Sequence, residues 1–260
     1  MTAHDRPLAN KTCLVMGSTA GIGRAIAQAF LHAGAEGVML NGRDEQRGID
    51  ARETLQTAFP DQPVHLALGD VSAGAASVVV EETVEKFGRL DVLVCSTGGD
   101  AIPALFHTLD PDIIPEQVAA GFLGPILAAR AAVPHMTKAG GGVILTIASD
   151  AAKIATPGES IIGGVMAGIV MFTRGLAIEG KRVGIRANCL TPSIVRNTPL
   201  YHRLMADAFA GKLFAKAEAM AHLGVTEPED LAALAVFIAS DAAEKITGQA
   251  ISVNGGISAA

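Results

Sequence analysis

Seven short apolar runs alternate with longer stretches of helical periodicity, and this alternation constrains the fold more than any other feature. The apolar runs predict strands at residues 12–16, 38–40, 64–68, 90–94, 143–147, 185–190 and 250–253. The stretches between them predict helices near residues 24–33, 45–58, 77–87, 113–136, 160–178 and 229–240. Such alternation is typical of a parallel sheet, and strands this apolar are buried on both faces. We therefore predict a doubly wound α/β fold with helices on both faces of about seven parallel strands.

The chain has 260 residues, a length that suits one domain of this class. Half of the residues are apolar and 29 are glycine, whereas aromatic residues make up only 4%. The core must therefore be built from Ala, Val, Ile and Leu packed closely on the backbone.

Charge and cysteine usage exclude several classes of partner. The net charge of −6 argues against binding to nucleic acid or to an anionic membrane. Cys13, Cys95 and Cys189 form no CxxC pair, so we expect reduced, buried thiols in a cytoplasmic protein. The histidines show no metal-ligand spacing, and we expect no metal.

The sequence predicts neither a membrane span nor a signal peptide. The longest apolar run, residues 161–173, is shorter than the roughly 20 residues of a membrane span. The segment Met1–Leu8 has no apolar stretch typical of a signal peptide.

The first predicted strand runs directly into Gly17-Ser18-Thr19-Ala20-Gly21-Ile22-Gly23, and a helix follows. A glycine turn at the start of a helix places backbone amides where they can hold a pyrophosphate. A tight strand-to-helix turn needs glycine even without a ligand, so the glycines alone leave both interpretations open. The spacing Gly-x-x-x-Gly-x-Gly resembles the cofactor turn of the short-chain dehydrogenase/reductase (SDR) family, with Met16 where that family usually has threonine.

Further segments resemble landmarks of this family in the same order, so the resemblance spans nearly the whole chain. Asp70-Val71 resembles the pair that holds the adenine ring, and Asn188, Thr191 and Pro192 lie in the segment that leads to the nicotinamide. Thr247-Gly248-Gln249 and Asn254-Gly255-Gly256 resemble the C-terminal signature. The resemblance implies a Rossmann-type fold. It also implies a set of cofactor-binding residues: Gly17, Ser18, Thr19, Gly21, Ile22, Gly23, Arg43, Asp70, Val71, Ser96, Gly98, Pro192 and Val195.

The end of the second predicted strand reads Asn41-Gly42-Arg43 and has no carboxylate to receive a ribose hydroxyl. An arginine suits a 2′-phosphate, which favours NADP over NAD, although a solvated surface arginine is the alternative. After the fourth strand, Cys95-Ser96-Thr97-Gly98 replaces the family's usual Asn-Asn-Ala-Gly. We expect this loop to keep its turn with altered contacts.

Catalysis in this family rests on Asn, Ser, Tyr and Lys, and the chain keeps only the serine. Ser149 ends the fifth predicted strand, whereas Ile162 and Met166 stand at the positions of the tyrosine and the lysine, and Gly121 at that of the asparagine. The tyrosine normally moves a proton and the lysine lowers its pKa and holds the nicotinamide ribose, which neither Ile nor Met can do. NADP or NAD is therefore expected to bind weakly.

The flanking residues make this alignment difficult to shift. Pro157-Gly158 and Ala167-Gly168 match the family on both sides of the missing pair, and the only tyrosine in the chain is Tyr201. The helix at residues 160–178 is apolar around its whole circumference, which predicts burial on all sides or an apolar face covered by another subunit.

Other polar residues fall in or near the expected cleft and offer an acid–base pair for a dehydration or an isomerisation. They are Asp150, Glu159, Asp100, His107, Tyr201 and His202. Each is also explained as an ordinary exposed loop or helix residue. Residues 193–225 resemble the substrate-covering lobe of the single domain. Its basic residues Arg203, Lys212 and Lys216 suit a small acidic ligand such as a coenzyme A ester, although an exposed amphipathic helix explains them equally well.

Three functions remain open at this point. The favoured one is a non-catalytic subunit, a pseudoenzyme inactive alone, that forms a heteromeric oxidoreductase with an intact SDR paralogue. The second is a divergent SDR enzyme with NAD(P)-dependent or non-redox chemistry, and the third is a nucleotide-sensing binding protein. Because the subunit interface of this fold can persist while a site decays, we expect an oligomer with the paralogue or with itself, as a dimer or tetramer.

Overall fold

The computed structural model describes residues 6–98 and 101–260. Asp100 and residues 1–5 of the predicted N-terminal segment lie outside the described residues. The strands of the described chain are β1 (Thr12–Met16), β2 (Gly37–Gly42), β3 (Val64–Leu68), β4 (Val92–Cys95), β5 (Gly142–Ile147), β6 (Ile185–Pro192) and β7 (Ala250–Val253). They form one parallel sheet in the order β3-β2-β1-β4-β5-β6-β7, which confirms the predicted fold class.

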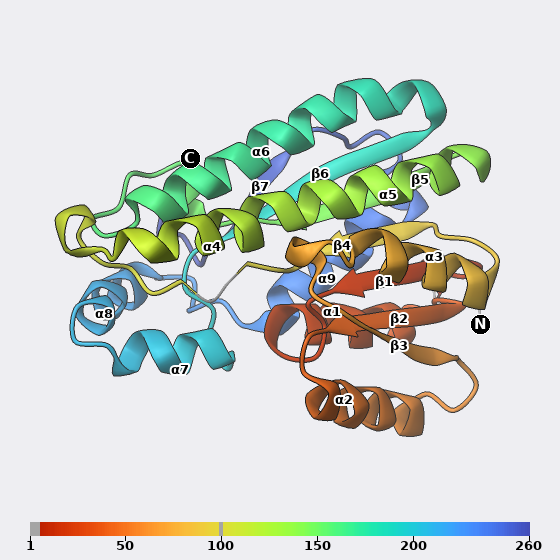
Figure 1. Cartoon of the computed structure of the whole chain (residues 1–260), viewed down its shortest axis with the longest axis horizontal. Helices are drawn as coiled ribbons and strands as arrows, with labels where there is room; N and C mark the ends of the chain where they lie inside the picture. Colours follow the sequence, from red (N-terminus) through yellow and green to blue (C-terminus); the bar gives the residue numbers. More distant parts are fainter. Residues whose placement is uncertain (1–5, 99–100) are drawn as a thin grey trace.

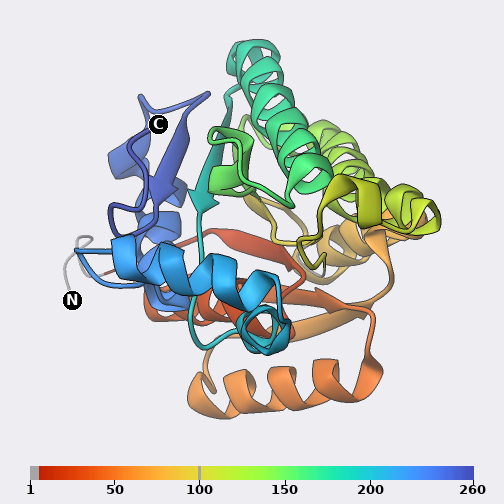
Figure 2. The ribbon, with the colours of Figure 1, turned by 90° about the vertical axis from the view of Figure 1, so that its left-hand side faces the viewer.

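Helices cover both faces of this sheet (Figures 1 and 2). They are α1 (Gly21–His32), α2 (Glu45–Ala58), α3 (Ala76–Phe87), α4 (Ile114–Val118), α5 (Gly124–Lys138), α6 (Ser160–Gly180), α7 (Pro199–Ala206), α8 (Ala210–Met220) and α9 (Pro228–Ala239). Side chains of α1, α2 and α9 enter the core on one face, and those of α3, α5 and α6 enter the core on the other. The helices α7 and α8 lie beyond the carboxyl edge of the sheet (Figure 1).

The alternation of side chains along β1 shows why its sequence is apolar throughout. Cys13 and Val15 belong to the core on the α1 and α9 side, whereas Leu14 and Met16 belong to the core under α3 and α5. Successive side chains of a strand point to opposite faces, and both faces are covered here. All four side chains are fully buried, as a parallel sheet between two helical layers requires.

Every predicted strand and long helix is present, with ends shifted by a few residues. The helix predicted at residues 113–136 is one continuous stretch in which a π-helical turn, Ala119–Leu123, joins α4 to α5. The prediction missed α7 and α8.

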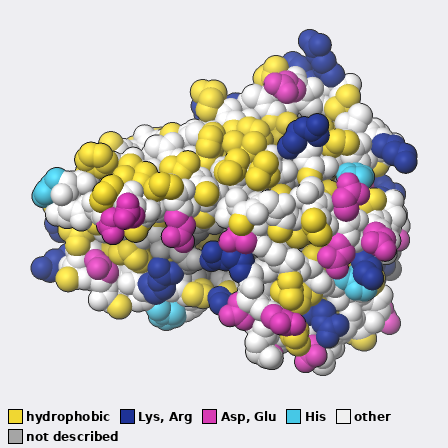
Figure 3. Space-filling view, viewed as in Figure 1, with side chains coloured by type: hydrophobic (Ala, Val, Ile, Leu, Met, Phe, Trp, Pro, Cys, Tyr) yellow, Lys and Arg dark blue, Asp and Glu magenta, His cyan; other side chains and the backbone are white. Residues whose placement is uncertain are grey.

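The prediction that the helix at residues 160–178 is buried on all sides is wrong for the single chain. One face of α6 packs on the sheet through Met166, Ile169 and Val170. The opposite face exposes Met171 by 64% and Ile178 by 62%, because the sheet can cover only one side of a helix. Figure 3 shows hydrophobic side chains gathered over α6 and α5.

Two helical stretches, Pro111–Lys138 and Ser160–Val183, are long and apolar enough by composition to cross a membrane. This differs from the sequence-based expectation, which counted only the uninterrupted apolar run. In the structure both stretches pack on the sheet as members of one helical layer (Figure 1), which is the arrangement of core helices in an α/β domain.

Candidate functional site

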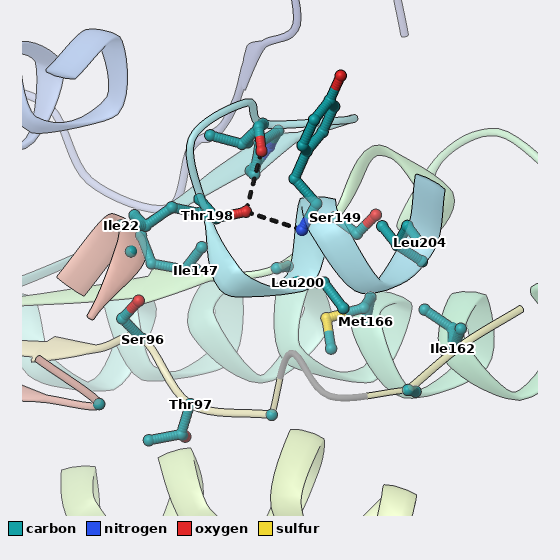
Figure 4. Close-up of a pocket in the computed structure, with 18 of the residues that line it drawn as sticks. Ile22, Ser96, Thr97, Ile147, Ser149, Ile162, Met166, Thr198, Leu200 and Leu204 are labelled. Carbon is teal, nitrogen blue, oxygen red and sulfur yellow. Dashed lines mark hydrogen bonds between the residues drawn. The ribbon is translucent and has the colours of Figure 1, made fainter. Parts of the chain in front are cut away.

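A cavity of about 860 Å³ opens at the carboxyl edge of the sheet. The strand order reverses between β1 and β4, and ligands of doubly wound folds bind at this kind of switch point. Figure 4 shows labelled lining residues that extend from Ile22 and Ser96, at one end, to Ile162 and Leu204, at the other. The cavity therefore reaches from the glycine turn after β1 to the start of α6 and to α7.

The glycine turn is packed too tightly to accept side chains. A Cβ atom at Gly17, where φ is +71°, would lie 2.3 Å from the carbonyl oxygen of Ser96. A Cβ atom at Gly23 would lie 2.3 Å from the carbonyl oxygen of Gly17. Ala20 caps α1 without a side-chain hydrogen bond, and the first turn has no acidic residue. The amides at this helix start therefore present partial positive charge to the cavity, as a pyrophosphate requires.

Ser18 departs from the predicted set of cofactor-binding residues. Its side chain is fully buried and does not belong to the lining of the cavity. The hydroxyl donates to the carbonyl oxygen of Val15 at 2.6 Å and accepts from the backbone amide of Asn41 at 3.0 Å. Ser18 therefore ties the glycine turn to β2 instead of facing a ligand. The other residues of the predicted set line the cavity: Gly17, Thr19, Gly21, Ile22, Gly23, Arg43, Asp70, Val71, Ser96, Gly98, Pro192 and Val195.

The far end of the cavity, beside β2 and β3, combines two carboxylates, Asp44 and Asp70, with basic groups. Asp70 Oδ1 accepts hydrogen bonds from the hydroxyl and the amide of Ser72, which hold the pKa of Asp70 below its ordinary value. Arg43 Nη1 lies 3.6 Å from Asp70 Oδ2, and the Arg43 side chain is 59% exposed. Arg47 also lines this end and pairs with Asp44. This composition suits an adenosine carrying a phosphate.

The loop after β4 keeps its turn despite its unusual sequence. Ser96 donates its amide to the carbonyl oxygen of Met16, and Gly98 has a φ of +96°. A Cβ atom at Gly98 would lie 2.6 Å from Cα of Gly121. This contact fixes the loop against the π-helical turn.

The segment after β6 divides into cavity residues and structural residues. Pro192 and Val195 line the cavity. Asn188 instead donates its side-chain amide to the carbonyl oxygen of Ile246 and accepts from the amide of Gln249. The Asn188 side chain thus joins β6 to the loop before β7.

The remaining segment after β6 carries α7 to the cavity. The Thr198 hydroxyl donates to the carbonyl oxygen of Val195 and accepts from the amide of Tyr201, both at 3.0 Å (Figure 4). This hydrogen bonding caps α7 and places Leu200, Tyr201 and Leu204 over the cavity.

The four positions of the family's catalytic tetrad lie close together in the structure. Ser149, Ile162 and Met166 line the cavity (Figure 4), whereas Gly121 lies in the π-helical turn behind them. A Cβ atom at Gly121 would lie 2.7 Å from Cγ1 of Val165 and 3.3 Å from Cε of Met166. Val165 and, less closely, Met166 therefore occupy the space into which a side chain at position 121 would extend.

Ser149 keeps a position in which its hydroxyl is available to a ligand. Its Oγ accepts a hydrogen bond from the amide of Ala151 at 3.2 Å. This bond caps the 3-10 turn Asp150–Ala152 and leaves the hydroxyl proton free to be donated. The Tyr201 hydroxyl, by contrast, donates to Glu218 Oε1 at 3.1 Å.

Two buried carboxyl groups lie in the lining beside these residues. Glu159 is 9% exposed, and burial raises its pKa; hydrogen bonding with the Thr156 side chain acts in the opposite direction, and the charge of Asp150 adds to the increase. Asp150 is 5% exposed. Its Oδ2 accepts from the Ser258 hydroxyl at 2.5 Å and from Asn254 Nδ2 at 3.2 Å.

Of the other polar candidates among the described residues, Tyr201 and Lys216 line the cavity, whereas His107, His202, Arg203 and Lys212 do not. Sequence reasoning missed Ser258 and Ile257, which the C-terminal segment brings into the lining. The turn-forming Asn254-Gly255-Gly256 was the only local signal that the chain folds back here.

The three cysteines are free and buried, as predicted. Burial raises the pKa of Cys95 to about 12 and that of Cys189 to about 11, and it also raises the pKa of Cys13. These thiols are therefore packing groups and have no thiolate character near neutral pH.

A family model and a relative that match this chain are both described as reductases. Residues 17–258 match a family model described as enoyl-(acyl carrier protein) reductase. A probable 2,4-dienoyl-CoA reductase of Bacillus subtilis is 31% identical over 249 residues, which cover 95% of this chain and 96% of that protein.

Solved structures agree in fold along nearly the whole length. A 7α-hydroxysteroid dehydrogenase complexed with NADH and 7-oxo glycochenodeoxycholic acid superposes with a TM-score of 0.89 at 25% identity, covering 98% of both chains. A gluconate 5-dehydrogenase of Burkholderia cenocepacia, in complex with NADP and tartrate, superposes with a TM-score of 0.85 at 27% identity, also covering 98% of both chains.

These relatives contradict the interpretation of the chain as a non-catalytic subunit. They are named as reductases and dehydrogenases, and none of these names describes a subunit without activity. The inference relied on the three replaced tetrad positions, Gly121, Ile162 and Met166, and on the apolar helix that carries two of them. It gave too little weight to a cavity that retains the glycine turn, Ser149 and two buried carboxyl groups.

Proposed function

Because the chain belongs to the short-chain dehydrogenase/reductase superfamily, we propose that it is a divergent NAD(P)-dependent oxidoreductase. The observation that carries this proposal is the continuity of the cavity. One end has the features of a dinucleotide site, and the other end has Ser149 among apolar walls. A protein that had lost its activity would have no need to keep both ends open.

The proposed cofactor site uses three groups of residues. The amides at the start of α1 bind the pyrophosphate, Asp70 and Val71 bind the adenine ring, and Pro192 and Val195 contact the nicotinamide end. A bound nicotinamide cofactor supplies or accepts a hydride. With Met166 in place of lysine, the ribose loses one donor, so we expect weaker binding than in an enzyme with the full tetrad.

We propose a preference for NADP. Arg43 and Arg47 line the end of the cavity beside β2, and Asn41 turns its side-chain amide inward to the carbonyl oxygens of Ala67 and Gly69. The second strand thus ends without a free carboxylate for a ribose 2′-hydroxyl, and the nearby guanidinium groups suit a 2′-phosphate.

The substrate end is largely apolar. The walls come from Ile162, Met166, Leu204, Phe214 and Met220, among others. Lys216 is a cation on the same lining. We propose an apolar carbonyl or conjugated enoyl substrate with an anionic extension such as a coenzyme A ester. By resemblance, residues 193–225, which contain α7 and α8, form the substrate-covering lobe of the single domain.

A non-redox reaction is the second candidate, and one observation favours it. Two buried carboxyl groups, Asp150 and Glu159, share the cavity, while the tyrosine and the lysine of the family are absent. Carboxyl groups alone can move a proton between carbon atoms in an isomerisation or a dehydration.

One experiment tests both candidates. The purified protein is titrated calorimetrically with NADPH and NADH, then assayed with crotonyl-CoA, 2,4-hexadienoyl-CoA and a 7-oxo steroid. We expect tighter binding of NADPH and oxidation of NADPH by at least one probe. Conversion of a probe without NADPH consumption would support the second candidate. Absence of binding of both nucleotides would overturn the proposal.

We also propose a cytoplasmic location, because the three cysteines are free thiols. Self-association through the exposed apolar face of α6, which includes Met171 and Ile178, would remove that face from water. Light scattering of the purified protein is expected to give a dimer or a tetramer; a monomer would contradict this proposal.

A further inference from the structure

Glu159 lies on the same side of α6 as the two altered tetrad positions. It directly precedes the helix as its N-terminal capping residue, and Ile162 and Met166 follow at spacings of three and four residues. Such spacings place side chains on one helical face, and all three residues line the same cavity. The carboxyl group is therefore one helical turn before the position where the family has its tyrosine.

The start of α6 is held close to the segment that carries Ser149. A Cβ atom at Gly163 would lie 2.9 Å from the carbonyl oxygen of Ala151, so the glycine permits this close approach. Ser149 immediately precedes the turn Asp150–Ala152, which contains that carbonyl group. The serine and Glu159 thus come from two elements in direct contact.

The contacts of the buried Glu159 carboxyl group do not explain its position by a helix cap or an ion pair. In the described part of the chain its carboxyl group makes no capping hydrogen bond to α6 and no salt bridge, and its hydrogen bonding is with the Thr156 side chain. A carboxyl group placed out of water with so few partners favours its neutral, protonated form, and burial accordingly raises its pKa.

Asp150, which lines the same cavity, is surrounded by hydrogen-bond donors and a nearby ammonium group. Besides the Ser258 and Asn254 donors, the Lys153 ammonium lies 4.0 Å from its Oδ1. This oxygen is buried and has no hydrogen-bond partner among the described residues. The two carboxyl groups of this cavity thus have different environments, the setting in which enzymes give two carboxyl groups different roles.

We propose that Glu159 is the proton-transferring group of this cavity and replaces the tyrosine of the family. The proposal rests on the proposed function. In a reduction, the O–H bond of the Glu159 carboxyl breaks and a new O–H or C–H bond forms on the substrate. NAD(P)H would be the reductant: its hydride would form a C–H bond on the substrate, NAD(P)⁺ would be the oxidised product, and the Glu159 carboxylate would regain a proton from water. Ser149 donates a hydrogen bond to the substrate oxygen.

The test compares Glu159→Gln with Glu179→Gln, which makes the same change at an exposed site near the far end of α6. Turnover is measured with NADPH and the probe that the wild type reduces. Loss of a positioned acid typically costs 10²–10⁴-fold, so we expect kcat of Glu159→Gln to fall by that factor with little change in KM. Glu179→Gln is expected to retain wild-type turnover, and Glu159→Asp, which keeps a carboxyl group, to regain part of it.

A readout independent of turnover accompanies the assay. Infrared difference spectra between the wild type and Glu159→Gln are recorded as the pH rises from 4 to 9. We expect the carbonyl band of a protonated carboxyl group to persist above the ordinary range of glutamate and to be absent from the variant. Titration of Glu159 in the ordinary range, or unchanged kcat in Glu159→Gln, would overturn the inference.

Nucleotide binding separates this inference from the proposed function. Calorimetry is expected to give the same NADPH affinity for the wild type and Glu159→Gln, because the cofactor residues lie on other elements. Failure of the wild type to bind nucleotide overturns the proposed function and this inference with it. Retained binding with unchanged kcat in the variant overturns the inference alone.

Discussion

At the scale of single residues, the protonation of Glu159 is coupled to stability. Burial raises its pKa above the ordinary value of 4.5, and Asp150 is the charged neighbour that adds to the increase. The folded state therefore binds more protons than the unfolded state above pH 4.5, so the unfolding free energy decreases as the pH rises through the raised pKa. We expect Glu159→Gln to lose this decrease.

Urea denaturation of the wild type and Glu159→Gln between pH 4 and 8 measures this effect. The stability difference between the two proteins should change in favour of the variant as the pH rises through that window. Parallel stability curves would show that Glu159 has an ordinary pKa in the folded protein.

A second prediction at this scale concerns the restored pair Ile162→Tyr with Met166→Lys. Met166 is 8% exposed and packs in an apolar cluster with Ala148, Ile169 and Val170. An ammonium group there loses solvation and an apolar contact, so we expect a loss of about 1–3 kcal/mol in unfolding free energy. Gly121 still lacks the side-chain amide of an asparagine, so we do not expect the turnover of an enzyme with the full tetrad. Denaturant titration measures the unfolding free energy of this variant, and the NADPH assay measures its turnover. Unchanged stability together with high turnover would contradict the prediction.

The sequence allowed us to predict which positions belong to the site, but it did not show the directions in which their side chains point. The spacing from Ser149 predicted that Ile162 and Met166 stand at the tyrosine and lysine positions, and both residues line the cavity. Ser18 was misplaced, since nothing local shows that its hydroxyl turns inward to Val15. The contact of Ser258 with Asp150 joins residues 108 positions apart, which local patterns do not encode.

At the scale of elements, the π-helical turn at Ala119–Leu123 is fixed by its contact with α6. Replacing Gly121 with alanine would gain up to about 1 kcal/mol of helix propensity, but the new methyl group would meet the β-branched Val165. Overpacking costs roughly 1–3 kcal/mol, so we expect Gly121→Ala to destabilise the protein by about 1 kcal/mol. Gly175→Ala in α6, where a Cβ atom meets nothing within 4 Å, is the matched control and should be neutral or stabilising.

Thermal unfolding followed by circular dichroism compares these two variants. A higher melting temperature for Gly121→Ala than for the wild type would contradict the steric argument. The sequence could not predict this contact, because the π-helical turn differs from the regular period on which helix assignment relies. The helices α7 and α8 were missed because their length, 8 and 11 residues, gives a weak periodic signal.

At the scale of the whole molecule, the fold class and the place of the ligand site could be predicted because the strands are buried on both faces of the sheet. Strands as apolar as β1 and β4 require two helical layers, and a glycine turn after β1 places the ligand site at the switch point. The prediction of a non-catalytic subunit failed because a function belongs to the entire cavity and not to the three replaced tetrad positions alone.

The three buried cysteines can report local opening of the sheet through their reactivity with thiol reagents. Cys13, Cys95 and Cys189 lie on β1, β4 and β6, so each thiol is a built-in probe of one strand. A thiol reagent can react only when the surrounding strands open, and its reaction rate then reports the opening free energy of that part of the sheet. We expect no modification of the native protein at pH 8 within minutes, and three thiols modified in denaturant, as followed by mass spectrometry. One rapidly reacting thiol in the native protein would identify the strand that opens first.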